Sequence, residues 1–157
     1  MNDGTGALRL MPLLVVMMIT ACINMKPYQA IDSYLEQGRP EAAEFVVDSM
    51  LQTKLRKFGR SPMTGKERDT TMGFELAHWA VFYRQCGAYE KSEQCDSMAA
   101  GYLGRGHGKR HPEYLEARYD QAYVQLLQGK RTEALSTMKE VRDVLMSSPD
   151  AGKTDVD

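Results

Sequence analysis

The chain has 157 residues, 43% of them hydrophobic and 26% charged, and its formal net charge is −1. This length suits one domain, and the composition is that of a globular protein. The near-zero net charge does not indicate nucleic-acid binding, and three cysteines are too few for a small disulfide-dense fold. Eleven methionines and only 8% aromatic residues favour an adaptable helical core.

The amino-terminal segment, residues 1–21, has the features of an export signal. A short leader containing Arg9 precedes the apolar run 11–20, which is too short for a permanent transmembrane helix. Asp3 weakens the positive charge of the leader. We therefore expect these residues to direct the chain to a membrane and to be absent from the folded domain.

The end of this segment, Ile19-Thr20-Ala21-Cys22, resembles the signal of bacterial lipoproteins. The resemblance implies cleavage before Cys22, lipidation of that cysteine and a short tether over residues 22–26. Ile23 stands where an aspartate would favour the inner membrane, so the resemblance indicates the periplasmic face of the outer membrane. An ordinary secretory signal or a weak membrane anchor is the alternative.

Residues 27–148 predict an all-α domain of three antiparallel helix hairpins. In each hairpin a segment with helical periodicity ends at a glycine, and a second helical segment follows within three residues. Such short connections make the two helices antiparallel neighbours. The hairpins run from Pro27 through Gly38 to about Leu55, from Thr70 through Gly87 to Tyr102, and from Pro112 through Gly129 to Met146.

The residues that follow the last hairpin predict no further structure. Pro149 ends the helix, and we expect the polar residues 149–157 to form a disordered tail.

Small or aliphatic residues recur at fixed distances from the three glycines, where they allow close helix packing. Seven residues before the glycines stand Ile31, Ala80 and Ala122, and five residues after them stand Ala43, Ser92 and Ala134. Four residues before them stand Tyr34, Tyr83 and Gln125.

This pattern resembles tetratricopeptide repeats, and residues 87–134 resemble the repeats of the kinesin light chain type. The motifs that carry the second resemblance are Gly87-Ala-Tyr-Glu-Lys-Ser92, His111-Pro-Glu-Tyr-Leu115 and Ala122-Tyr-Val-Gln-Leu-Leu-Gln-Gly129. The resemblance implies that the hairpins stack into a short right-handed solenoid. Ser92 in place of alanine, Gln125 in place of an aromatic residue and a long first link depart from the family pattern. A generic six-helix domain is the alternative.

In the resembled family the first helix of each hairpin lines a concave groove that binds a peptide or a partner helix. The corresponding groove residues here are Tyr28, Asp32, Phe74, Arg84, Glu116, Tyr119 and Tyr123. Leu126 and Leu127 fall at groove positions as well. The alternative assigns Phe74, Leu126 and Leu127 to the core.

The segments that link consecutive hairpins are basic. We expect them to lie along one edge of a stack and to form one positive ridge, which could bind an anionic headgroup, a glycan or an acidic protein. The ridge residues are Arg56, Lys57 and Arg60 from the first link and Lys109 and Arg110 from the second. Solvated loop charge is the alternative.

Two cysteines remain once Cys22 is assigned to the lipid. An oxidising compartment favours a disulfide between Cys86 and Cys95. Two buried thiols that pack as small apolar residues are the alternative.

No motif indicates catalysis or a cofactor. Residues 59–67 and 103–110 resemble phosphate-binding loops, but both lack the required glycine spacing and the hydroxyl residue. The Glu75–His78 pair has no second copy, as a di-iron site would require. We therefore expect no enzyme activity, cofactor, bound metal, nucleic-acid partner or small-molecule substrate.

The sequence leads to two functional hypotheses. The first is a membrane-anchored lipoprotein that acts as a protein–protein interaction scaffold or assembly factor in the bacterial cell envelope. Pilus, secretion or polysaccharide export machinery would be its setting. The second is an immunity or inhibitor lipoprotein that neutralises a toxin acting on the envelope. An enzyme lacking any familiar motif is a third class, which a closed polar pocket would indicate.

Overall fold

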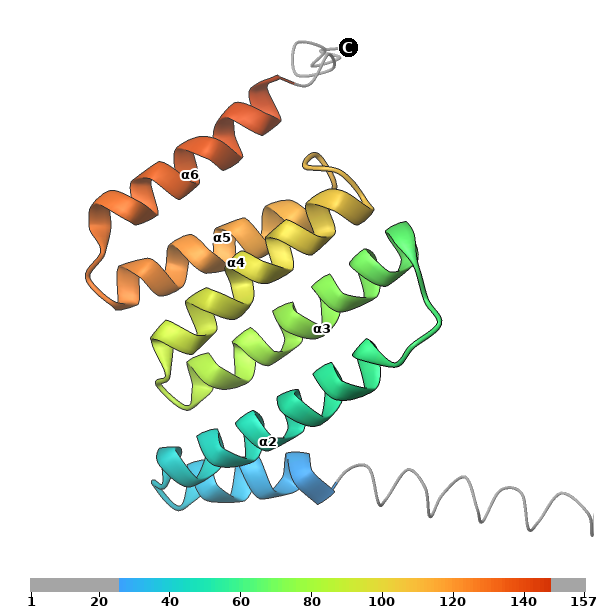
Figure 1. Ribbon diagram of the computed structural model, residues 1–157. Helices are drawn as coiled ribbons and strands as arrows, with labels where there is room; N and C mark the ends of the chain where they lie inside the picture. The colour runs from blue at the N-terminus through green and yellow to red at the C-terminus, as the bar shows by residue number, and fades with distance from the viewer. Residues whose placement is uncertain (1–25, 148–157) are drawn as a thin grey trace, which may run out of the picture.

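The structure, a computed structural model, describes residues 26–147, and all secondary structure in this range is helical. A helix over residues 26–36 is followed by α2 (Pro40–Gly59), α3 (Gly65–Gln85), α4 (Tyr89–Gly106), α5 (Pro112–Leu127) and α6 (Arg131–Met146). The predicted all-α class is confirmed. Consecutive helices run in opposite directions and lie side by side in chain order (Figure 1).

The three expected glycine turns have the same backbone geometry. The φ angles of Gly38, Gly87 and Gly129 are 65°, 76° and 76°, a left-handed conformation that side chains disfavour. In each turn the N–H of the residue after glycine donates to a carbonyl five residues earlier. These bonds join Arg39 to Tyr34, Ala88 to Tyr83 and Lys130 to Gln125, each at 2.9 Å. The sequence therefore located each hairpin turn correctly.

The small residues at the repeated positions are buried between the helices of each hairpin. Ile31, Ala80 and Ala122 are buried, as are Ala43, Ser92 and Ala134. Trp79, Leu76 and Leu103 complete the centre of the core. The two departures from the family pattern are also accommodated, because Ser92 Oγ donates to the Ala80 carbonyl at 2.9 Å and Gln125 Oε1 accepts from Thr137 at 3.0 Å.

The links between hairpins are shorter than the sequence predicted. We expected the first link to extend from about residue 56 to residue 69, whereas α2 continues to Gly59 and α3 begins at Gly65. The physical reason is that lysine, arginine and glutamate favour helices, so a charged run does not end one. Arg56 and Lys57 consequently lie in the last turn of α2, and Arg60 is its carboxyl cap.

Polar clamps join consecutive hairpins near the glycine turns. Asp48 on α2 accepts from the Tyr83 hydroxyl at 2.7 Å and from Lys91 Nζ at 2.7 Å. Glu93 on α4 accepts from Gln125 Nε2 at 2.8 Å and from Lys130 Nζ at 2.7 Å. The residue four positions before the glycine thus bonds to the preceding hairpin in both cases.

Candidate functional site

The first helices of the hairpins meet on one face of the molecule. Tyr28, on the helix over residues 26–36, packs against α3 with ring centroid distances of 6.2 Å to His78 and 5.6 Å to Phe82. Its ring also stacks on Trp79, at 6.3 Å. The first helix and α3 are therefore joined by a cluster of aromatic rings.

Helix α5 joins the same face through Arg84. The Arg84 Nη2 atom lies 3.3 Å from Asp120 Oδ2, and its guanidinium carbon lies 5.6 Å from the centroid of the Tyr123 ring. A guanidinium over an aromatic face is attracted by the negative charge of that face. Arg84 thus connects α3 directly to α5.

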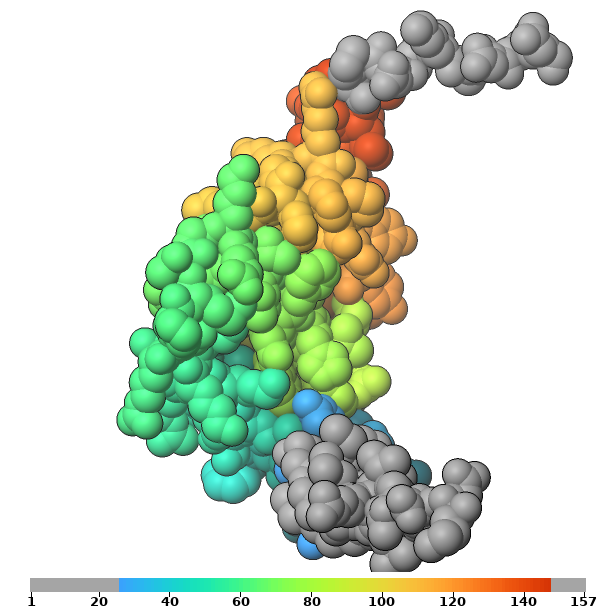
Figure 2. All heavy atoms as spheres, turned by 90° about the vertical axis from the view of Figure 1, so that its right-hand side faces the viewer, coloured from blue at the N-terminus to red at the C-terminus, as the bar shows by residue number. Residues whose placement is uncertain are grey.

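The surface formed by these helices exposes large apolar side chains. We name this set the aromatic face, and it consists of Phe74, Val81, Tyr119, Tyr123, Leu126 and Leu127. Tyr119 is 56% exposed, Leu126 53% and Phe74 43%, so the assignment of Phe74, Leu126 and Leu127 to the core is wrong. On α3 and α5 these side chains recur at helical spacing, which is typical of one solvent-facing stripe. Figure 2 shows that the molecule has a curved outline.

The remaining groove residues occupy two kinds of environment. Asp32 and Glu116 are exposed to solvent, whereas Tyr28 and Arg84 are half-buried and engaged in the contacts described above. Tyr28 and Arg84 therefore support the aromatic face instead of presenting free side chains to a partner.

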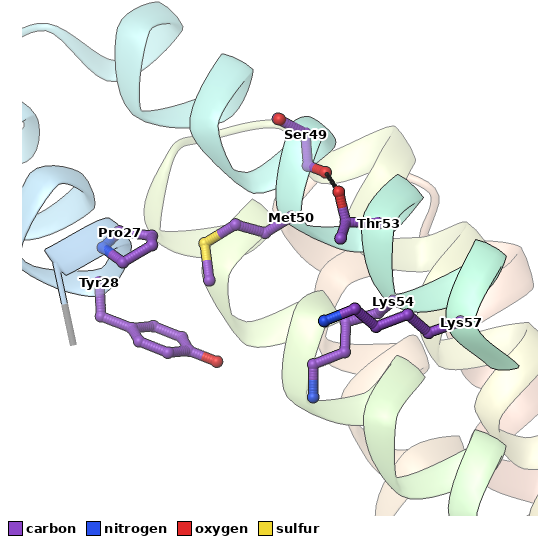
Figure 3. A pocket seen from close by; sticks show the side chains of 7 residues that line it. All are labelled: Pro27, Tyr28, Ser49, Met50, Thr53, Lys54 and Lys57. Carbon is purple, nitrogen blue, oxygen red and sulfur yellow. Dashed lines mark hydrogen bonds between the residues drawn. The ribbon is translucent and has the colours of Figure 1, made fainter. Parts of the chain in front are cut away.

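A cleft of about 560 Å³ opens beside the start of the first helix (Figure 3). It is lined by Pro27, Tyr28, Ser49, Met50, Thr53, Lys54 and Lys57. The side chains of Tyr28, Lys54 and Lys57 extend into the same space. Lys54 Nζ lies 2.9 Å from Glu75, whereas Lys57 has no ion-pair partner among residues 26–147. Ammonium groups beside hydroxyls can bind an anion. The sequence did not predict this cleft because its lining residues come from two different helices.

The predicted ridge residues are exposed and lie at the ends of helices. Arg56 donates to the Gln52 carbonyl at 3.3 Å, and Arg110 donates to the Ser147 carbonyl at 2.5 Å. Within the described range, none of Arg56, Lys57, Arg60, Lys109 and Arg110 forms an ion pair.

A buried carboxylate on α4 was not anticipated. Asp96 is 1% exposed, and neither of its carboxylate oxygens has a hydrogen-bond partner in the structure. Burial, with a contribution from Asp120, raises the pKa of Asp96 to about 7, although Arg84 opposes the shift. Its place on the buried stripe of α4, four residues after Ser92, was a sequence signal that could have revealed it.

The two cysteines of the domain form no disulfide in the structure. Cys86 and Cys95 are both buried free thiols that belong to the core. Burial raises the pKa of the Cys95 thiol to about 12 and also raises that of Cys86. The proposed lipidation site, Cys22, and the predicted tail lie outside the described residues.

The described range contains neither a metal-binding cluster nor a helix suited to crossing a bilayer. Among residues 26–147, no three histidine, cysteine, aspartate or glutamate side chains are grouped to hold a metal ion. Within the same residues, no helix combines the length and the apolar character of a membrane span.

No family model matches the chain, and no significant match is found among curated proteins or solved structures.

Proposed function

We propose that this chain is a lipid-anchored helical-repeat protein that binds a segment of a partner protein on its aromatic face. The observation that carries the proposal is the shared surface of the first helices, where six large apolar side chains are exposed. Contiguous exposed apolar patches of this kind are typical of interaction sites. The contacts of Tyr28 with α3 and of Arg84 with α5 hold the surface together.

The repeat architecture that we propose is of the tetratricopeptide type. Three glycines with left-handed φ, three matching turn hydrogen bonds and six buried small or aliphatic residues support it. Three hairpins are about the minimum that such an architecture needs, because each hairpin buries its apolar face against the next.

The aromatic face suits an extended peptide or a helix. Tyrosine supplies a large contact area and a hydroxyl at little entropic cost, and the exposed Glu116 adds a negative charge. The setting that we propose is a pilus, secretion or polysaccharide export assembly of the bacterial envelope. Lipidation at Cys22 would keep the binding face at the membrane.

Crosslinking in intact cells tests this proposal. A photoreactive amino acid at Tyr119 should capture a partner, whereas the same group at Phe45 should not, because Phe45 is exposed on a second helix, α2. The double substitution Tyr119→Ala and Tyr123→Ala should abolish co-purification of the partner that is identified in this way, while the helical circular dichroism signal is retained. Phe45→Ala with Leu135→Ala is the matched control, since both residues are exposed and apolar on second helices.

Equal capture from Tyr119 and Phe45 would contradict the assignment of the binding face. Capture of a toxin in place of an assembly component would support the inhibitor hypothesis.

A further inference from the structure

Charged residues are sorted between the two edges of the helix stack. We name the edge with the two links the link edge. It comprises the start of the first helix, the end of α2, the start of α3, the end of α4, the start of α5 and the end of α6. Its basic residues are Lys26, Lys54, Arg56, Lys57, Arg60, Lys66, Arg68, Arg105, Lys109, Arg110, Arg118, Lys139 and Arg142. Its acidic residues are Glu67, Asp69, Glu75, Glu113, Glu116, Glu140 and Asp143.

The opposite edge, which holds the three glycine turns, is acidic. We name it the turn edge, and its acidic residues are Asp32, Glu36, Glu41, Glu44, Asp48, Glu90, Glu93, Asp96, Asp120 and Glu133. Its basic residues are Arg39, Arg84, Lys91, Lys130 and Arg131. The net charge of −1 therefore conceals a molecule with one positive and one negative edge.

The link edge is continuous from the first hairpin to the third. Lys54 on α2 reaches Glu75 on α3 at 2.9 Å, and Arg105 on α4 reaches Asp69 on α3 at 3.1 Å. The rings of His107 and His111 stack at 4.1 Å across the second link. Figure 1 shows both links on the right-hand side, and Figure 2 looks directly at this side.

The described chain also enters the fold at this edge. Pro27, at the start of the first helix, lines the cleft that also holds Lys54 and Lys57 (Figure 3). Cys22 precedes Lys26 by four residues, which span at most about 14 Å. If Cys22 carries lipid, as proposed above, the link edge is within reach of the membrane surface. A separation of this size is comparable to the Debye length of about 8–10 Å, so attraction between opposite charges persists.

We propose that the link edge lies on the membrane and binds the headgroups of anionic phospholipids. The lipid at Cys22 supplies attachment, and the basic residues supply orientation. The phosphate nearest to the anchor would occupy the cleft between Tyr28 and Lys57 (Figure 3). The acidic turn edge then points away from the membrane. This inference rests on the proposed lipid anchoring at Cys22. We favour a membrane over an acidic protein as the partner because the first helix starts at the positively charged link edge, close to the proposed anchor.

Flotation of the full chain with lipid vesicles tests the headgroup contact. The chain carries Cys22→Ser, so lipidation plays no part, and the vesicles contain phosphatidylcholine alone or equal parts of phosphatidylcholine and phosphatidylglycerol. Binding to neutral vesicles measures the contribution of the apolar segment at residues 11–20. The additional binding to anionic vesicles measures the contribution of the basic residues and should disappear in high salt.

The triple substitution Lys57→Gln, Arg60→Gln and Lys109→Gln should reduce this additional binding about tenfold or more. The matched triple Arg39→Gln, Lys130→Gln and Arg131→Gln removes the same charge away from the link edge, and it should change binding less than about twofold. Equal binding to both vesicles, or equal loss in both triples, would overturn the inference. The inference would also be overturned if the triple substitution on the link edge abolished binding of an acidic protein and left vesicle binding unchanged.

Lipidation itself is followed separately, by incorporation of labelled palmitate into the wild-type chain and not into Cys22→Ser. Absence of the label would contradict the proposed anchoring and leave the vesicle result standing.

Orientation is tested with a fluorophore attached at Thr64→Cys on the link edge or at Glu41→Cys on the turn edge. The buried thiols of Cys86 and Cys95 remain unlabelled. Brominated lipids should quench the first fluorophore and not the second, and equal quenching would overturn the proposed orientation.

Discussion

The guanidinium of Arg84 lies over the ring of Tyr123, 5.6 Å from its centroid, and its Nη2 atom lies 3.3 Å from Asp120. Both Arg84 and Asp120 are largely shielded from water, so their attraction is weakly screened. We predict a coupling energy of about 1 kcal/mol between Arg84→Ala and Asp120→Ala in a double-mutant cycle of urea unfolding. The exposed pair Arg142 and Asp143 is the control, where the coupling should be near zero. Equal coupling in the two cycles would show that shielding is unimportant at Arg84.

The carboxylate of Asp96 should make the domain less stable at alkaline pH. Its pKa is raised from 3.8 to about 7 in the folded state. Between these values the native protein binds a proton that the unfolded chain has released, so stability decreases as pH rises through this range and is lowest above it. Asp96→Asn should therefore raise the free energy of unfolding by roughly 2–4 kcal/mol at pH 8 and have little effect near pH 4.

Urea unfolding followed by the fluorescence of Trp79 measures this effect, and the exposed Asp143→Asn is the control. If Asp96→Asn raised the free energy of unfolding equally at both pH values, ionisation of the buried Asp96 carboxylate could not be the cause.

Helices α3 and α4 approach closely at a glycine. A Cβ atom added at Gly73 would lie 2.5 Å from Leu103 Cγ, a side chain in the fully buried core. Gly73→Ala should therefore destabilise the domain by about 1–3 kcal/mol through overpacking. Gly101 lies in α4 with only the end of Arg105 nearby, at 3.8 Å, so Gly101→Ala should stabilise the domain by about 0.5–1 kcal/mol. Thermal unfolding distinguishes the two variants, and two shifts of the same sign would be inconsistent with the packing at Gly73.

The thiols of Cys86 and Cys95 should be inert in the native protein. Both are buried, and burial raises their pKa values, so little thiolate exists at neutral pH. We predict no reaction with a thiol reagent in buffer and reaction of both residues in denaturant. Mass spectrometry of the protein isolated from its native cells without reductant should show two reduced thiols in this domain. A mass lower by two hydrogens would instead identify the disulfide that the sequence left open.

Local chain geometry was predictable from the sequence wherever a single residue type determines it. Gly38, Gly87 and Gly129 each adopt the left-handed turn expected of them, and Ala43 and Ala134 are buried as expected. The helix ends next to the first link were not predictable, because charged residues between Leu55 and Thr70 are compatible with both helix and loop.

Features that depend on contacts between several helices were harder to predict from the sequence. The exposed positions of Tyr119 and Tyr123 followed from the spacing on one helix, but the contact between Arg84 and Tyr123 joins side chains from two. Ser92 and Gln125 depart from the resembled repeat pattern, and the structure shows that they form hydrogen bonds to Ala80, Thr137 and Glu93. The sequence shows which residues are polar, and only the packing shows which partners satisfy them.

The polar clamps at Asp48 and Glu93 also bear on how the hairpins can move. Both clamps lie near the turn edge, where they join each hairpin to the next. Between the second and third hairpins, an axis of relative motion should therefore run along that edge, and displacements should grow toward the link. The spacing between Phe74 and Tyr119 would then vary more than the spacing between Arg84 and Tyr123. A partner would meet a surface that is fixed at one end and adjustable at the other.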